Sequence, residues 1–133
     1  MKIIVSSTGS SLDAPVDPRF GRCSVFLLVN TENMKYEVIS NQSLSQAHGA
    51  GIAAAQQVAQ LGVEAVVTGQ VGPNAHMALA QAGITVVTGA SGTVQNAVKA
   101  YLNGQLNNAT GPTVGGHFGQ GGGRGGGRGR RRV

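Results

Sequence analysis

The chain has 133 residues, which is enough for one domain with a single hydrophobic core. Its formal net charge of +5 is carried by the last ten residues, which contain five of the ten basic side chains: Arg124, Arg128, Arg130, Arg131 and Arg132. The other five basic side chains balance the five acidic ones. The folded part is therefore close to neutral and is not expected to be a basic nucleic-acid-binding domain. A single cysteine excludes an intramolecular disulfide framework, and the first apolar run is too short for a signal peptide or membrane span, so we expect a cytoplasmic protein without a membrane partner.

The first 40 residues predict three strands. A β-branched run at 2–7 is typical of a buried strand and is followed by an irregular, Gly- and Pro-containing segment at 8–22. Residues 24–30 form a second apolar run, a tight turn follows, and the alternation at 35–40 favours a half-exposed antiparallel strand.

The rest of the predicted fold alternates helices and strands. The Ala-rich segment at 49–61 predicts a helix that buries Ile52, Ala55, Val58, Ala59 and Leu61, and it is followed by a strand at 64–68. Pro73 suits the first turn of a helix at 74–81, a strand follows at 84–88, and Thr93 is the expected N-cap of a helix ended by Gly104. This order predicts a three-layer α/β domain over residues 1–107, with a mixed five-stranded sheet flanked by helices in a ribonuclease H-like architecture.

Residues 108–133 change composition to glycine and arginine with very few apolar side chains, so we expect a disordered tail. The run GGGRGGGRGRRRV resembles an RGG-type segment, whose arginines neutralise phosphates. Weak, non-specific nucleic-acid binding by this tail is one alternative function, and docking of a partner protein or simple solubilisation is another.

Several stretches occur together in a recognisable order, and they resemble the dinitrogenase iron-molybdenum cofactor biosynthesis family: KIIVSS at 2–7, DPRFGRC at 17–23, Asn41 with HGAG at 48–51, VVTGQVGPNA at 66–75, and YLNGQL at 101–106. That family includes the small nitrogenase cofactor carrier and the carboxy-terminal domain of the cofactor assembly protein. The resemblance implies a non-catalytic protein that binds or carries an iron- or molybdenum-sulfur cluster, or its precursor, between cofactor donor and acceptor proteins.

DPRFGRC has the composition of one wall of an anion site. Arg19 and Arg22 are expected to donate charge-assisted hydrogen bonds to an anionic cluster, and Gly21 to permit close approach of the backbone. Cys23 is a candidate metal ligand whose pKa these arginines would lower. The alternative is structural: Asp17 pairs with Arg19 and braces the loop, Phe20 fills part of the core, and Cys23 is a small buried apolar residue.

Two helix starts add further candidates. His48 precedes the Gly49–Gly51 helix entry, where free N–H groups favour anions, and it either ligates a metal or bonds locally. The GPNAH turn adds Gly72 and Asn74 as candidate cofactor-binding residues and His76 as a candidate metal ligand, although the lysine and Ser/Thr of a phosphate-binding loop are missing.

Enzymatic functions receive little support from the sequence. A nuclease needs clustered carboxylates, but the first strand has none and the acids are scattered: Asp13, Asp17, Glu37 and Glu64. There is no CxxC motif, and no GxGxxG motif follows the first strand. We therefore expect a binding protein without catalytic residues.

Overall fold

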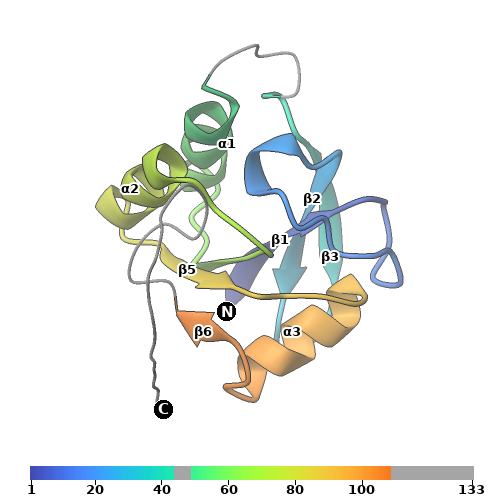
Figure 1. Ribbon diagram of the computed structural model, residues 1–133. Helices are drawn as coiled ribbons and strands as arrows, with labels where there is room; N and C mark the ends of the chain where they lie inside the picture. The colour runs from blue at the N-terminus through green and yellow to red at the C-terminus, as the bar shows by residue number, and fades with distance from the viewer. Residues whose placement is uncertain (44–48, 109–133) are drawn as a thin grey trace.

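The computed structural model describes residues 1–43 and 49–108 (Figure 1). Its elements run in the order β1 (Lys2–Ser7), the 3-10 turn η1 (Phe20–Arg22), β2 (Val25–Asn30), β3 (Tyr36–Ser40), α1 (Ala50–Ala59), β4 (Ala65–Val67), α2 (Pro73–Gln81), β5 (Thr85–Thr88), α3 (Val94–Leu102) and β6 (Asn107–Asn108). The expected tail, apart from Asn108, lies outside the described residues, so its disorder and its binding role remain predictions.

One mixed sheet joins all the strands in the order β3-β2-β1-β4-β5-β6. β1 is antiparallel to β2 and parallel to β4, and β5 is parallel to β4. The predicted mixed sheet of five strands is confirmed, and the two-residue β6 adds an antiparallel edge beside β5.

The helices cover both faces of the sheet and give the predicted three layers (Figure 1). Side chains alternate along β1, so Ile4 packs with residues of α1 and α2 such as Val58 and Leu79. Ile3 and Val5 point to the other face, where they belong to a second cluster with the buried side of α3. No helix in the described parts of the chain is long and apolar enough to cross a membrane.

The helix ends follow the predicted local signals. Pro73 occupies the first turn of α2, and the Thr93 side chain accepts a hydrogen bond from the Asn96 N–H at 3.1 Å, which caps α3. Gly83 and Gly104 follow α2 and α3 with φ of 77° and 72°, a conformation that favours glycine.

The connections that follow β1, β3, β4 and β5 all leave the sheet at the carboxyl ends of these strands. These four strands run in one direction, because β1, β4 and β5 are parallel, while β3 is antiparallel to β2 and β2 is antiparallel to β1. The chain passes from β1 to β2 and β3 on one side, and then returns through α1 to β4 on the other side. The carboxyl ends of β1 and β4 therefore form a topological switch point, where α/β proteins commonly bind ligands.

Candidate functional site

An open pocket of about 340 Å³ lies at the carboxyl ends of β1 and β4 and is lined by the segments 19–22, 49–52 and 70–75. These segments come from the connection after β1, the start of α1 and the start of α2. The pocket brings together all the residues predicted to bind a cofactor: Arg19, Arg22, Gly49, Gly51, Gly72 and Asn74. Their binding role itself stays a prediction.

Glycines let the backbone segments around the pocket approach one another closely. A Cβ atom on Gly21 would lie 2.9 Å from Gly51 Cα, and a Cβ atom on Gly51 would lie 3.2 Å from Ala75 Cβ. A Cβ atom on Gly69 would lie 2.7 Å from Pro18 Cα. Larger residues at these positions would force the segments apart, so the glycines fix the spacing of the pocket walls.

Two helices begin at the pocket with glycine as their N-cap residue, Gly49 for α1 and Gly72 for α2. Neither helix has an acidic residue in its first turn. The N–H groups of the first turn have no acceptor within an α-helix, and the helix dipole adds partial positive charge at this end. The pocket therefore combines two helix ends that favour an anion.

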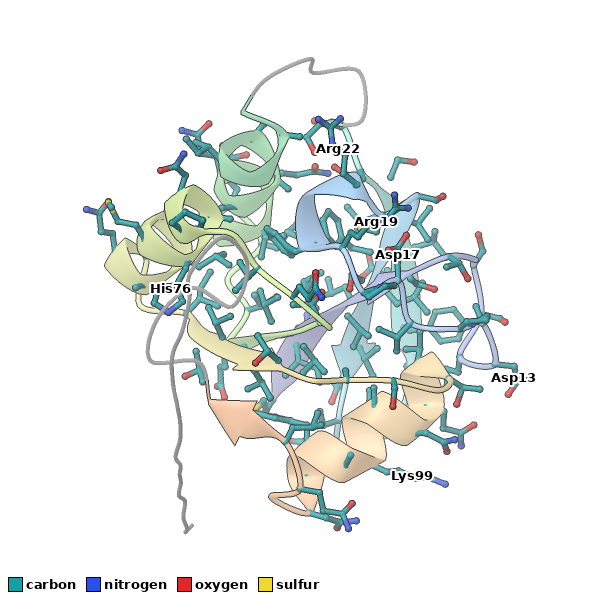
Figure 2. All side chains as sticks on the ribbon, in the orientation of Figure 1. Asp13, Asp17, Arg19, Arg22, His76 and Lys99 are labelled. Atoms are coloured by element: carbon teal, nitrogen blue, oxygen red, sulfur yellow. The ribbon has the colours of Figure 1, made fainter. Side chains whose placement is uncertain are left out.

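Asp17 holds the backbone and side chain of Arg19. Its Oδ1 accepts hydrogen bonds from the Arg19 N–H at 2.9 Å and from Nε at 3.3 Å, and its Oδ2 accepts from Nη2 at 3.4 Å. The carboxylate is buried while the Arg19 side chain is largely exposed, and the hydrogen bond with Asp17 raises the pKa of Arg19. Asp17 and Arg19 therefore pair as the structural alternative predicts (Figure 2), and Arg19 also lines the pocket.

The thiol of Cys23 lies in the hydrophobic core and is not among the pocket-lining residues. Burial, and next the negative charge of Asp17, raise its pKa to about 12, so the expectation that neighbouring arginines lower this pKa is wrong. The Cys23 Sγ donates a hydrogen bond to the Phe20 carbonyl oxygen at 3.4 Å. The ring centroids of Phe20 and Phe26 lie 5.4 Å apart. The structural alternative for Cys23, a small buried apolar residue, fits this position.

The predicted metal ligands do not come together in the described residues. His48 lies outside them, so its ligand role stays a prediction. His76 is half-buried on α2 but does not line the pocket, and Figure 2 shows it well separated from Arg19 and Arg22. Within residues 1–43 and 49–108, no three His, Cys, Asp or Glu side chains are grouped so that they would hold a metal ion.

Asn41 and Ser43 lie beside the pocket wall, and no site role is predicted for either from the sequence. Both are buried, and both lie within hydrogen-bonding distance of the Gly21 carbonyl oxygen. The sequence signal for this pair was only a polar residue, Asn41, directly after the strand predicted at 35–40. It does not identify a partner 20 residues earlier in the chain.

Comparisons with known proteins agree with this architecture. The family described as dinitrogenase iron-molybdenum cofactor matches residues 1–104. The apo form of the orange protein from Desulfovibrio gigas is similar at 44% identity and a TM-score of 0.82, over 84% of this chain and 95% of that one. A NifB-like protein from Thermotoga is similar at 35% identity and a TM-score of 0.74, over 86% and 98% of the two chains. An uncharacterized protein of Methanocaldococcus jannaschii is 33% identical over 94 residues, which are 68% of this chain and 80% of that protein. This chain therefore belongs to the dinitrogenase iron-molybdenum cofactor family.

Proposed function

We propose that this protein is a non-catalytic carrier that holds an iron- or molybdenum-sulfur cluster, or its precursor, as cargo in the pocket at the carboxyl ends of β1 and β4. The observation that carries the proposal is the convergence of Arg19, Arg22 and two glycine-capped helix starts on that pocket. Metal-sulfur clusters are commonly anionic, so they are matched by fixed cations and free N–H donors. Family membership adds independent support for this class of cargo.

The cargo would be held mainly by hydrogen bonds and charge. The described residues that line the pocket offer guanidinium groups, the amides of Gln70 and Asn74, and the first-turn N–H groups of α1 and α2. None of these lining residues carries a thiol, imidazole or carboxylate, and the Cys23 thiol is held in the core. A ligand bound in this way can be passed on without breaking a metal–thiolate bond, which suits transfer between donor and acceptor proteins.

The same lining supports a binding role more than a catalytic one. General acid–base and nucleophilic catalysis need a carboxylate, imidazole, thiol, activated hydroxyl or amine at the reacting atoms. The described lining residues supply none of these groups. They supply positive charge and hydrogen-bond donors, which hold a ligand without transforming it.

Anaerobic titration of the full chain with tetrathiomolybdate tests the proposal. The measurements are the molybdenum and sulfide retained after desalting, by elemental analysis, and the change in charge-transfer absorption on binding. We expect the wild-type protein to retain the anion, and the double variant Arg19→Gln/Arg22→Gln to lose most of this retention. Lys99→Gln is a control for the loss of one positive charge outside the pocket, because Lys99 lies on α3 on the other side of the sheet (Figure 2).

The control separates binding in the pocket from general electrostatic attraction of the anion to the protein. Retention by Lys99→Gln at the wild-type level, together with loss in the arginine variant, supports the pocket as the binding site. No retained molybdenum or iron in the wild type, either from tetrathiomolybdate or after reconstitution with iron and sulfide, would reject the carrier function.

A further inference from the structure

Asn41 and Ser43 are buried polar residues at the end of an exposed edge strand. Asn41 directly follows β3, most of whose side chains are exposed, yet Asn41 and Ser43 are only 5% and 2% exposed. Buried polar side chains are stable when they are hydrogen-bonded, so the partners of these two residues indicate what they hold in place.

Both side chains bind the backbone of the segment that forms one pocket wall. Asn41 Nδ2 donates to the Gly21 carbonyl at 3.2 Å and to the Cys23 carbonyl at 2.8 Å. Asn41 Oδ1 accepts from the Ser43 N–H at 3.0 Å. The single hydroxyl proton of Ser43 has two acceptors within reach, Asn41 Oδ1 and the Gly21 carbonyl at 3.2 Å. The two residues therefore form one unit attached to the carbonyls at positions 21 and 23.

This unit fixes the wall of the pocket that is in contact with α1. Gly21 lies in η1, its carbonyl is bound by Asn41 and Ser43, and its Cα faces the backbone of Gly51 at a distance that leaves no room for a methyl group. The next residue is Arg22, which lines the pocket. A change in the orientation of the Gly21–Arg22 peptide would therefore move the Arg22 backbone relative to the start of α1.

We propose that Asn41 and Ser43 are positioning residues for the pocket, which set the orientation of η1 and thereby place Arg22 against the first turn of α1. This inference rests on the proposed function, because it assigns these residues to cargo binding. Neither side chain lines the pocket, so their effect on the cargo is transmitted through the backbone of η1.

Gln57 provides a matched control for a purely structural role. Its Nε2 donates to the Ser40 carbonyl at 2.7 Å, and its Oε1 accepts from the Gln42 N–H at 3.1 Å. It thus binds the same connection through the same kind of side-chain amide, but its contacts stop at β3 and the residue after Asn41. Neither Ser40 nor Gln42 lines the pocket.

The experiment compares Asn41→Ala, the milder Ser43→Ala, and the control Gln57→Ala in the full chain. The first measurement is the Kd for tetrathiomolybdate under anaerobic conditions. The second needs no ligand: the hydrogen-exchange rate of the Arg22 amide, which donates to the Arg19 carbonyl at 3.2 Å inside η1, relative to the amides of the central strand β1. The β1 amides report changes in global stability, so acceleration at Arg22 without acceleration in β1 identifies a local effect on η1.

We expect Asn41→Ala to weaken binding by roughly tenfold or more, in line with the loss of other residues that orient ligand-binding groups, and to accelerate Arg22 exchange relative to β1. Ser43→Ala should act in the same direction with a smaller effect, because Asn41 keeps both carbonyl contacts. Gln57→Ala should change both quantities by less than about twofold.

The results separate this inference from the carrier function. Unchanged relative exchange of Arg22 in Asn41→Ala would overturn the inference, as would unchanged affinity or equal effects in Gln57→Ala. If the wild type does not bind tetrathiomolybdate, the carrier proposal fails. The assignment of Asn41 and Ser43 to cargo binding then fails as well. A selective effect on Arg22 exchange would then show only that Asn41 orders η1.

Discussion

Replacing Gly21 by alanine should force η1 away from the start of α1. The new methyl carbon would lie 2.9 Å from Gly51 Cα, 3.0 Å from Gly51 N and 3.3 Å from the Ala50 carbonyl carbon. Favourable carbon–carbon contacts occur at about 3.5–4.0 Å. The contacted atoms belong to the backbone of the first turn of α1, so no side-chain rotation can relieve the overlap.

The expected cost is that of inserting a methyl group into a packed site, about 1–3 kcal/mol of the free energy of unfolding. For a domain of about 100 residues, each 1 kcal/mol lowers Tm by about 4–8 °C. Thermal and urea unfolding followed by far-UV circular dichroism measure this change without needing a tryptophan, which the chain lacks.

Gly72→Ala is the matched control on the same pocket. Gly72 has φ of −77° and ψ of 171°, a conformation open to alanine, and a Cβ atom there would have no neighbour within 4 Å. Because alanine is a poorer N-cap residue than glycine, Gly72→Ala should lower the free energy of unfolding by about 0.5–1 kcal/mol, which is less than the loss expected for Gly21→Ala. If Gly21→Ala is as stable as the wild type, or if Gly72→Ala is equally destabilised, the close approach of η1 and α1 does not control the stability of this wall.

Two further predictions concern the core and the last helix. The raised pKa of Cys23, about 12 against about 9 for an ordinary thiol, means that the unfolded chain loses this proton at lower pH than the folded chain does. The free energy of unfolding should therefore fall as pH rises from about 9 to 12, by at most about 1.4 kcal/mol per pH unit from this group. Urea titrations of Cys23→Ala should lack this component, and an identical pH slope in both proteins would contradict the assignment. Thr93→Ala should lose about 1 kcal/mol because Asn96 N–H loses its cap acceptor, whereas Thr93→Ser should stay close to the wild type in thermal unfolding; equal losses in both would exclude the capping role.

The positions of the strands and helices could be predicted because their signals are local. The strand at 2–7 has the predicted bounds, and Pro73 and Thr93 mark helix starts through their own geometry. The buried face of α1 was predicted less well: Ala59 is exposed and Ile52 is only half-buried beside the pocket. Nearly every position of AGIAAAQQVA is small or apolar, so the sequence offers little contrast between the face toward the sheet and the face toward solvent.

The candidate site could be predicted at the level of its segments but not of its side-chain directions. The sequence indicates an anion-binding wall at 17–23 and two glycine-containing helix starts, and the strand topology brings these segments together at one pocket. The depth of Cys23 depends on how Phe20 and Phe26 pack, and the role of Asn41 depends on carbonyls about 20 residues away in the chain. Such long-range contacts leave no periodic pattern in the sequence.

The charge around DPRFGRC is well suited to reversible binding. Asp17 offsets one of the two arginines, so the segment contributes a net charge of about +1, and the rest of the attraction would come from partial charges at the two helix starts. Each of these terms is modest and weakened by salt. Cys23 is packed in the core, and this burial raises the pKa of its thiol, so the pocket lining in the described residues contains no thiolate. If the pocket holds cargo as proposed, its affinity for tetrathiomolybdate should therefore fall as the ionic strength of the titration rises.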